Sequence, residues 1–191
     1  MIHWLIKNAD SRVIEQRFLL RKKDDMDPFI TVVPTKYHKM YIQRMTDDWS
    51  KGRVLGVFNN INMKIPEFRQ RFMSHLNTLD IAFQRQLALT CDVAYKHTTL
   101  LLCCHYNDFP LIQWCIYHGV DVNQSNCNGC SPMLVSAYTG DAVTVKVLLN
   151  NNADINQCLD GGASPFYVVC LNNRIEIVKV LLDNKANIHK T

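Results

Sequence analysis

The chain has 191 residues, 48% of them hydrophobic and 20% charged, which is an ordinary globular composition with enough apolar material for a core. The net charge of +4 is uneven, because residues 1–96 carry 16 Lys and Arg against 10 Asp and Glu, whereas residues 97–191 carry 5 against 7. The longest basic run, Arg21–Lys23, is followed at once by two aspartates. We therefore expect solvated helix faces and no surface for nucleic acid or acidic lipid.

The sequence shows no sign of export or of a membrane span. The opening MIHWLIKNADSR has too short an apolar run for a secretory signal, and charges interrupt it. No stretch approaches the ~18 apolar residues of a membrane-spanning helix. Eight cysteines without a secretory route favour reduced thiols, so a cytoplasmic protein is expected.

Residues 1–96 are predicted to form a small, mostly helical domain, for which a winged-helix-like fold is one form. Helices are expected near residues 2–8 and 11–23, with a short extended piece at Pro28–Val33. We expect this domain to dock onto the segment that follows and to cap it.

A stronger helix is predicted where five apolar residues fall on one stripe: Tyr37, Met40, Tyr41, Met45 and Trp49. Gly52 is expected to stop this helix. Val57–Met63 reads as a linker, and further helices are expected over residues 66–77, beginning at Pro66, and over residues 79–90. The aromatic stripe is interpreted as core.

Three stretches in the second half repeat at a step of 33 residues without an insertion. They run from Thr98 to Asn123, from Ser131 to Asn156 and from Ser164 to His189. Ser131-Pro132 and Ser164-Pro165 are typical helix starts, since a hydroxyl caps free backbone N–H groups and Pro fits the first turn.

Each stretch also predicts two helix ends, at residues expected to adopt a left-handed backbone. Asn107, Gly140 and Asn173 are expected to end the first helices, and Gly119, Asn152 and Lys185 the second helices. Lysine adopts this conformation poorly, so the third unit is predicted to be the least well terminated.

The three stretches resemble the ankyrin repeat, a hairpin finger followed by two antiparallel helices. The family pattern has a Thr-Pro-Leu-His start, a Gly between the helices and a Leu-Leu, Gly-Ala, Asn ending. The resemblance covers residues 97–191 and implies an all-α helical solenoid of three repeats with short hairpin fingers, over residues 97–123, 124–156 and 157–189. Stacking of the units would supply the stability.

The sequence departs from the family pattern at several positions. Leu101, Leu134 and Tyr167 stand where the family usually has His, and Thr98-Thr99 lacks the Pro. Lys96 stands where the finger Gly would be, so a degenerate first finger is expected. No polar cap follows the third unit, so we expect an open apolar face and a chain that is a fragment of a longer protein.

The segment Tyr37–Phe72, followed by LALTCD and then the repeats, resembles the part that follows the nucleotide-binding module in some NACHT-type (STAND) signalling ATPases. In those proteins ankyrin repeats form the sensor end. The phosphate-binding motif itself is absent, because KGRVLG has two glycines and no Lys-Ser/Thr after them. The resemblance implies a regulatory part without ATPase activity.

Cys127 and Cys130 raise three alternatives: a zinc site, a redox pair and a hairpin turn. Zinc would need two more ligands, for which the candidates are Cys158, Cys103, Cys104, His97 and His105. Cys158 offers a plausible third sulfur, but no firm fourth ligand is found. A redox pair would use Cys130 just before the Ser131 cap. The hairpin is favoured, with Asn128-Gly129 supplying the positive φ of a tight turn.

No catalytic constellation is recognised. The seven histidines are scattered, and no Ser, His and Asp fall at hydrolase spacings. Asp121, Asp154 and Asn187 recur at one repeat position and are read as structural loop residues. His105 and His118 are read as solvated or loop contacts. We therefore expect a protein that is not an enzyme and needs no metal or cofactor.

The expected function is recognition of a protein partner on the concave face of the repeats; the alternatives are a sensor part of a NACHT-type ATPase and a substrate adaptor for ubiquitin ligation. The family's variable positions give the candidate contact residues. They are His105, Tyr106, Ser125, Cys127, Asn128, Cys130, Tyr138, Thr139, Asp160, Gly161, Ala163, Leu171 and Asn172.

Overall fold

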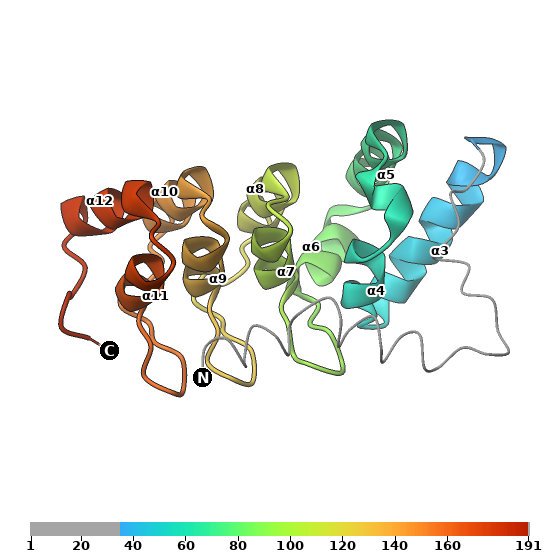
Figure 1. Ribbon diagram of the computed structural model, residues 1–191. Helices are drawn as coiled ribbons and strands as arrows, with labels where there is room; N and C mark the ends of the chain where they lie inside the picture. Colours follow the sequence, from blue (N-terminus) through green and yellow to red (C-terminus); the bar gives the residue numbers. More distant parts are fainter. Residues whose placement is uncertain (1–34, 191) are drawn as a thin grey trace, which may run out of the picture.

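The computed structural model describes residues 35–190, and the helices expected near residues 2–8 and 11–23 and the extended piece at Pro28–Val33 lie outside this range. The described part is all-α, as predicted (Figure 1). Its elements are η1 Thr35–Tyr37, α3 His38–Ser50, α4 Val54–Phe58, η2 Ile61–Lys64, α5 Pro66–Thr78, α6 Ile81–Leu89, α7 Thr99–His105, α8 Phe109–Tyr117, α9 Pro132–Thr139, α10 Ala142–Asn150, α11 Pro165–Leu171 and α12 Ile175–Asp183. Residues 35–190 contain no β-strand that would make a winged helix, only an isolated bridge between Cys91 and Thr98.

The first helix of each repeat begins where the hydroxyl residues predict. Thr98, Ser131 and Ser164 accept hydrogen bonds from the backbone N–H three residues on, at 3.0, 3.3 and 3.1 Å. Each hydroxyl thereby satisfies one of the N–H groups that have no partner within the helix. The repeat is therefore defined by a cap at the same position in all three units.

The helix ends also lie where they were predicted. All six expected residues have positive φ, between 52° and 88°. The prediction that the third unit is the least well terminated is wrong for its hydrogen bonds: the N–H groups of Lys185 and Ala186 bond to Leu182 and Leu181 at 2.9 Å each. The bonds that end α10 are 3.1 and 3.0 Å long. The third unit therefore loses stability only through the left-handed backbone conformation of Lys185, which is unfavourable for a residue with a Cβ.

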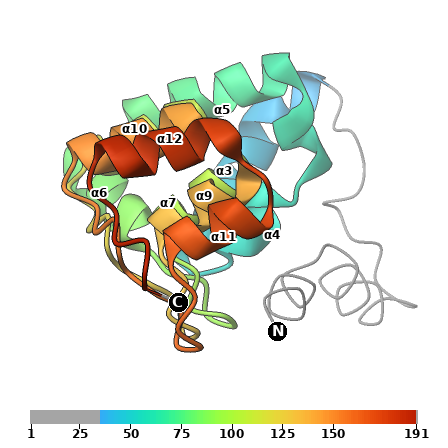
Figure 2. The same ribbon diagram turned by 60° about the vertical axis from the view of Figure 1, so that its left-hand side comes forward.

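The three repeats stack side by side in two rows of helices. The first helices, α7, α9 and α11, pack on one another in one row, and the second helices, α8, α10 and α12, form the other (Figures 1 and 2). The hairpin fingers precede the first helices in the chain and extend away from the N-terminal ends of these helices, all in one direction. Helices α4 and α6 pack against α7, and α6 also packs against α8, so the N-terminal helices adjoin the first repeat.

An aromatic cluster around Trp49 joins the N-terminal helices to the first repeat. The Trp49 ring is fully buried and stacks on Phe72 at 6.1 Å, with Phe58 at 5.8 Å and Trp114 at 5.9 Å. The Trp49 indole N–H donates to the Thr99 hydroxyl at 3.1 Å. One continuous hydrophobic core consequently runs from α3 to α12.

Two predictions about the N-terminal half are wrong. Tyr37 and Met40 are 46% and 69% exposed, so the buried stripe of α3 is formed by Tyr41, Met45 and Trp49 without them. Val57–Met63 is not a linker, since it contains the end of α4 and most of η2. Gly52 does follow α3 with φ of 77°, and α5 and α6 match their predictions to within two residues.

Candidate functional site: the fingers and the first helices

The finger around Cys127 and Cys130 is a tight hairpin built by Asn126. The Asn126 side-chain oxygen accepts from the N–H groups of Asn128 and Cys130, both at 3.0 Å, and the Asn126 N–H donates to the Cys130 carbonyl at 3.0 Å. Gly129 supplies the positive φ of 73°, whereas Asn128 does not have one. The turn prediction is confirmed, and Asn126 is the structural residue that sequence reasoning missed.

The first finger keeps this plan with a wider hairpin. Lys96 adopts φ of 56° where Gly129 stands in the second finger, and the Asp92 carboxylate replaces the Asn126 amide by accepting from Ala94 and Tyr95 at 3.0 and 3.1 Å. Its closing bond joins Asp92 to His97, one residue further than in the second finger. The first finger therefore departs from the other two, as expected from Lys96.

Neighbouring fingers are bonded to one another. The Cys127 thiol lies 3.5 Å from the Tyr95 carbonyl oxygen, and the Asp160 N–H donates to the Asn128 carbonyl at 3.3 Å. A Cβ at Gly129 would lie only 2.5 Å from an Asp160 carboxylate oxygen. The three fingers thus form a packed row.

The loops after the second helices are held by repeated side-chain bonds. Asp121, Asp154 and Asn187 each accept from the backbone N–H two residues on, at 2.9, 2.8 and 2.9 Å. Asn123 bridges to the next unit through the Asp154 N–H at 2.7 Å, and Asn156 does so through the Asn187 N–H at 2.8 Å. These residues are structural, as predicted.

The thirteen candidate contact residues differ widely in exposure. Five are exposed: Cys127, Asn128, Asp160, Gly161 and Leu171. Seven are half-buried: His105, Tyr106, Ser125, Cys130, Tyr138, Thr139 and Asn172. Ala163 is only 9% exposed and packs with Leu134 and Leu159 in a small core beside the finger, so its side chain offers little surface to a partner.

Tyr106 is engaged within the protein. Its ring stacks on Phe58 of α4 at 5.8 Å, and its hydroxyl donates to the Asn59 side-chain oxygen. Burial raises the pKa of Tyr106 to about 12. These contacts make Tyr106 part of the junction with the N-terminal helices. Tyr138, which occupies the position of His105 in the second repeat, has no ring stacked on it among the described residues.

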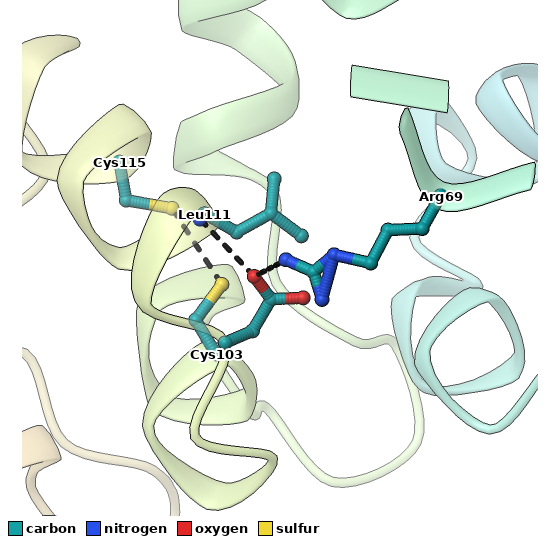
Figure 3. Close-up of polar contacts among 5 residues, drawn as sticks. Arg69, Cys103, Leu111 and Cys115 are labelled. Atoms are coloured by element: carbon teal, nitrogen blue, oxygen red, sulfur yellow. Dashed lines mark hydrogen bonds and ion pairs between the residues drawn. The ribbon is translucent and has the colours of Figure 1, made fainter. Parts of the chain in front are cut away.

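The cysteines do not form a redox or metal centre in the part that the structure describes. Burial raises the pKa of the Cys130 thiol to about 12, the opposite of what an attacking thiolate needs, and this disfavours the redox interpretation. Residues 35–190 hold no group of three or more His, Cys, Asp or Glu side chains placed for a metal ion. The closest thiols, Cys103 and Cys115, lie fully buried with their sulfurs 3.9 Å apart (Figure 3).

An open groove of about 370 Å³ lies between α8 and α10. Its walls are two aliphatic residues, one tyrosine and three amides: Ile116, Val147, Tyr117, Gln113, Asn150 and Asn151. None of these lining side chains is a carboxylate, a histidine or a thiol that could act in acid–base or nucleophilic catalysis. Across residues 35–190, no helix has the length and apolar character that a membrane crossing requires.

Residues 100–191 match the family model of ankyrin repeats, in three copies. This part of the chain belongs to the ankyrin repeat family, and the structure shows the matching caps, helix ends and fingers. Ankyrin repeats are generally protein–protein interaction modules and are typically not enzymes. A search of curated proteins found no match. The family match lies outside Tyr37–Phe72, so it lends no support to the NACHT resemblance of that segment.

Proposed function

We propose that this protein recognises a protein partner through the surface formed by its fingers and first helices. The carrying observation is that equivalent positions on this surface hold different side chains. His105, Tyr138 and Leu171 occupy one position of the three repeats. The residue that caps the same helix is a hydroxyl residue, Thr or Ser, in every repeat. A fixed frame with varied exposed side chains is suited to a specific partner.

The frame is also ordered before binding, which lowers the entropy cost of association. The bonds between neighbouring fingers hold Asn128 and Asp160 in place, and the Asn126 side chain fixes its own turn. Tyr138 is the aromatic residue at the centre of the proposed surface, and a half-buried tyrosine of this kind is a favoured contact residue. We expect Tyr138 to contribute most.

The charge of the repeats favours a protein over a nucleic acid. Residues 97–191 carry 5 Lys and Arg against 7 Asp and Glu, and Asp160 is exposed at the tip of the third finger. Phosphate backbones require a basic surface. All eight cysteines are free thiols, which is consistent with a cytoplasmic site of action.

The test is affinity capture with the wild-type chain and with a double variant, Tyr138→Ala and Asp160→Ala. Both side chains are solvent-accessible and neither forms part of the main core, so the variant should stay folded, which circular dichroism checks. Partners bound through the proposed surface should be lost by the double variant. The matched control is Lys146→Ala, an exposed residue of α10 in the other row of helices, which should retain them.

If the folded double variant captures the same proteins as the wild type, the fingers and first helices are not the contact surface. Equal losses with the Lys146→Ala control would also overturn it, because the effect would then not belong to the fingers and first helices.

A further inference from the structure

A histidine of the first finger contacts the asparagine that builds the second finger. The Asn126 side-chain nitrogen lies 3.1 Å from Nδ1 of His97, and both residues are half-buried. The Tyr95 ring stacks on the His97 imidazole, with 5.6 Å between the ring centres. The contact between His97 and Asn126 therefore joins two neighbouring fingers through their side chains.

The hydrogen bonds of the second finger fix the direction in which the Asn126 amide points. Its oxygen accepts from the backbone N–H groups of Asn128 and Cys130, both at 3.0 Å. A flipped amide would turn its NH2 group toward these two donors and leave both without an acceptor, which is unfavourable. The NH2 group consequently faces His97 and donates to Nδ1.

This orientation determines the protonation state of His97. A ring nitrogen that accepts a hydrogen bond carries no proton, so the neutral imidazole has its proton on Nε2. An imidazolium would place a second N–H group opposite the Asn126 NH2 group, with no acceptor between the two donors. The contact can therefore form only while His97 is neutral.

The next junction along the row of fingers is built differently. Cys130 and Leu159 stand 33 residues after His97 and Asn126, and both belong to the small apolar core that also contains Ala163. The second and third fingers are joined as well by the Asp160 N–H, which donates to the Asn128 carbonyl at 3.3 Å. Of these two junctions, the one between the first and second fingers is thus the one that a proton on an imidazole can change.

The surroundings of His97 set the pH at which this change occurs. Burial lowers the pKa of His97 below its ordinary value of 6.5. The Asp92 carboxylate of its own finger opposes this effect, and His105 at the end of α7 adds to it. The contact is therefore complete above pH 6.5 and is lost as the pH falls through the lowered pKa.

We propose that the contact between His97 and Asn126 is a proton-sensitive connection, which holds the first finger to the second at neutral pH and releases it on mild acidification. Asn126 keeps its own turn in both states, because the bonds of its oxygen and of its backbone N–H do not involve His97. The change is in the placement of the first finger relative to the second. This connection depends on the two fingers alone and not on whether they bind a partner protein.

Heteronuclear NMR of the whole, isotope-labelled chain tests the connection without a mutation. At neutral pH, His97 should be the neutral imidazole with its proton on Nε2, and a nuclear Overhauser effect should link its ring to the Asn126 NH2 group. On acidification this effect should disappear, and the Asn126 NH2 resonances should shift with the same midpoint as the His97 ring. The Asp160 N–H resonance should not follow that midpoint.

Asn126→Asp should reverse the response to acid. The Asp92 carboxylate already accepts from two backbone N–H groups in the first finger, at 3.0 and 3.1 Å, so an aspartate should build the second finger in the same way. The carboxylate would also accept from a protonated His97, and the pKa of His97 should therefore rise by about one pH unit or more.

Asn128→Asp is the matched control. It adds the same charge to the same finger at an exposed side chain whose contact is with Cys127 and not with His97. The pKa of His97 should therefore rise far less in this variant than in Asn126→Asp.

A proton on Nδ1 of His97 at neutral pH would overturn the proposal, because the Asn126 NH2 group would then have no acceptor. Equal rises of the His97 pKa in Asn126→Asp and Asn128→Asp would overturn it as well, since the effect would then come from charge alone. Asn126 NH2 resonances that do not respond when His97 titrates would show that the two side chains are not bonded.

Discussion

Thr99 joins the two halves of the molecule through one hydroxyl group. It stands where the second and third repeats have proline, accepts from the Trp49 indole at 3.1 Å and donates to the Thr90 carbonyl at 2.9 Å. Its backbone N–H also donates to Thr90 at 3.2 Å, a bond that proline could not make. The departure from the family pattern therefore has a structural reason.

Thr99→Val should destabilise the protein by about 1–3 kcal/mol, because it keeps the side-chain shape but leaves the buried Trp49 N–H without an acceptor. Urea unfolding followed by circular dichroism measures the change. The control is Thr78→Val, which removes an exposed hydroxyl bonded to the His75 carbonyl and should cost no more than about 0.5 kcal/mol. Equal effects of the two changes would contradict the role of Thr99.

Lys185 is the residue at which a substitution should stabilise the protein. Its φ of 62° is costly for a side chain with a Cβ, while its hydrogen bonds match those of the other repeats. Lys185→Gly should raise the free energy of unfolding by about 1 kcal/mol. The converse change, Gly119→Ala, should lower it by about 1 kcal/mol through backbone strain alone, because a Cβ there meets no atom within 4 Å. Urea unfolding measures the free energy of unfolding of both variants. A loss of stability in Lys185→Gly would contradict the prediction for Lys185.

At the scale of elements, an ion pair fastens α5 to the start of α8. The Asp108 carboxylate caps α8 by accepting from the Leu111 N–H at 3.2 Å and pairs with the Arg69 guanidinium, which reaches across from α5 (Figure 3). The Asp108 side chain is only 6% exposed, whereas Arg69 is 28% exposed.

Arg69→Met should therefore cost about 1–3 kcal/mol, since it leaves a buried carboxylate without its cation while the partial exposure of the site softens the penalty. Arg71→Met is the matched control on the same helix. Arg71 pairs with Glu67 at 3.0 Å, both side chains are about half exposed, and its loss should cost at most about 0.5 kcal/mol. Thermal unfolding compares the two variants. An equal shift in Tm would show that the ion pair between Arg69 and Asp108 contributes no more to stability than the exposed pair between Arg71 and Glu67.

The repeats could be predicted from the sequence because each element carries its own local signal. A hydroxyl at the cap, a left-handed residue at the helix end and apolar residues at helical spacing act within a few residues, and a step of 33 makes them visible three times. In the N-terminal half such signals occur once and are weaker. Tyr37 and Met40 fit the stripe of α3 by their spacing, yet their side chains are 46% and 69% exposed.

The candidate surface was less predictable, because burial there depends on neighbouring elements. Ala163 and Tyr138 both lie at positions that the family varies, yet Ala163 is covered by its own small core. Tyr106 is partly buried because it packs on Phe58 and donates to Asn59, and both of these residues lie outside the repeats. His118, read as a surface or loop contact, is 6% exposed and packs edge-on against Trp114.

At the scale of the whole molecule, we propose that residues 1–96 serve as the cap of the repeat stack. The core is continuous from α3 to α12, so the described part should unfold in a single transition. Residues 97–191 expressed alone should fail to unfold cooperatively, because Trp114 and the first helix would lose the cover of α3–α6. Urea titration of both chains tests this, and a cooperative transition of the isolated repeats at the same midpoint would contradict the capping role.

The stability of the whole molecule should fall on mild acidification. Burial lowers the pKa of His75, His97, His105 and His118 below the ordinary value of 6.5, and the nearby Arg85 adds to the effect on His118. The unfolded chain therefore binds more protons than the folded chain once the pH falls below about 6.5. The free energy of unfolding should be fully present above pH 6.5 and should decline as the pH falls toward the lowered pKa values.

His118 allows this prediction to be assigned to one side chain. Its ring packs at 4.5 Å from Trp114, and its buried Nε2 has no hydrogen-bond partner, so an imidazolium there would hold an unpaired N–H beside Arg85. The urea midpoint should drop between pH 7.5 and 5.5, and His118→Phe should reduce this drop. His189→Phe, which changes an exposed loop histidine, should leave the pH dependence as in the wild type. A midpoint that stays constant or rises on acidification would show that the folded state accepts protons on these histidines as readily as the unfolded chain does.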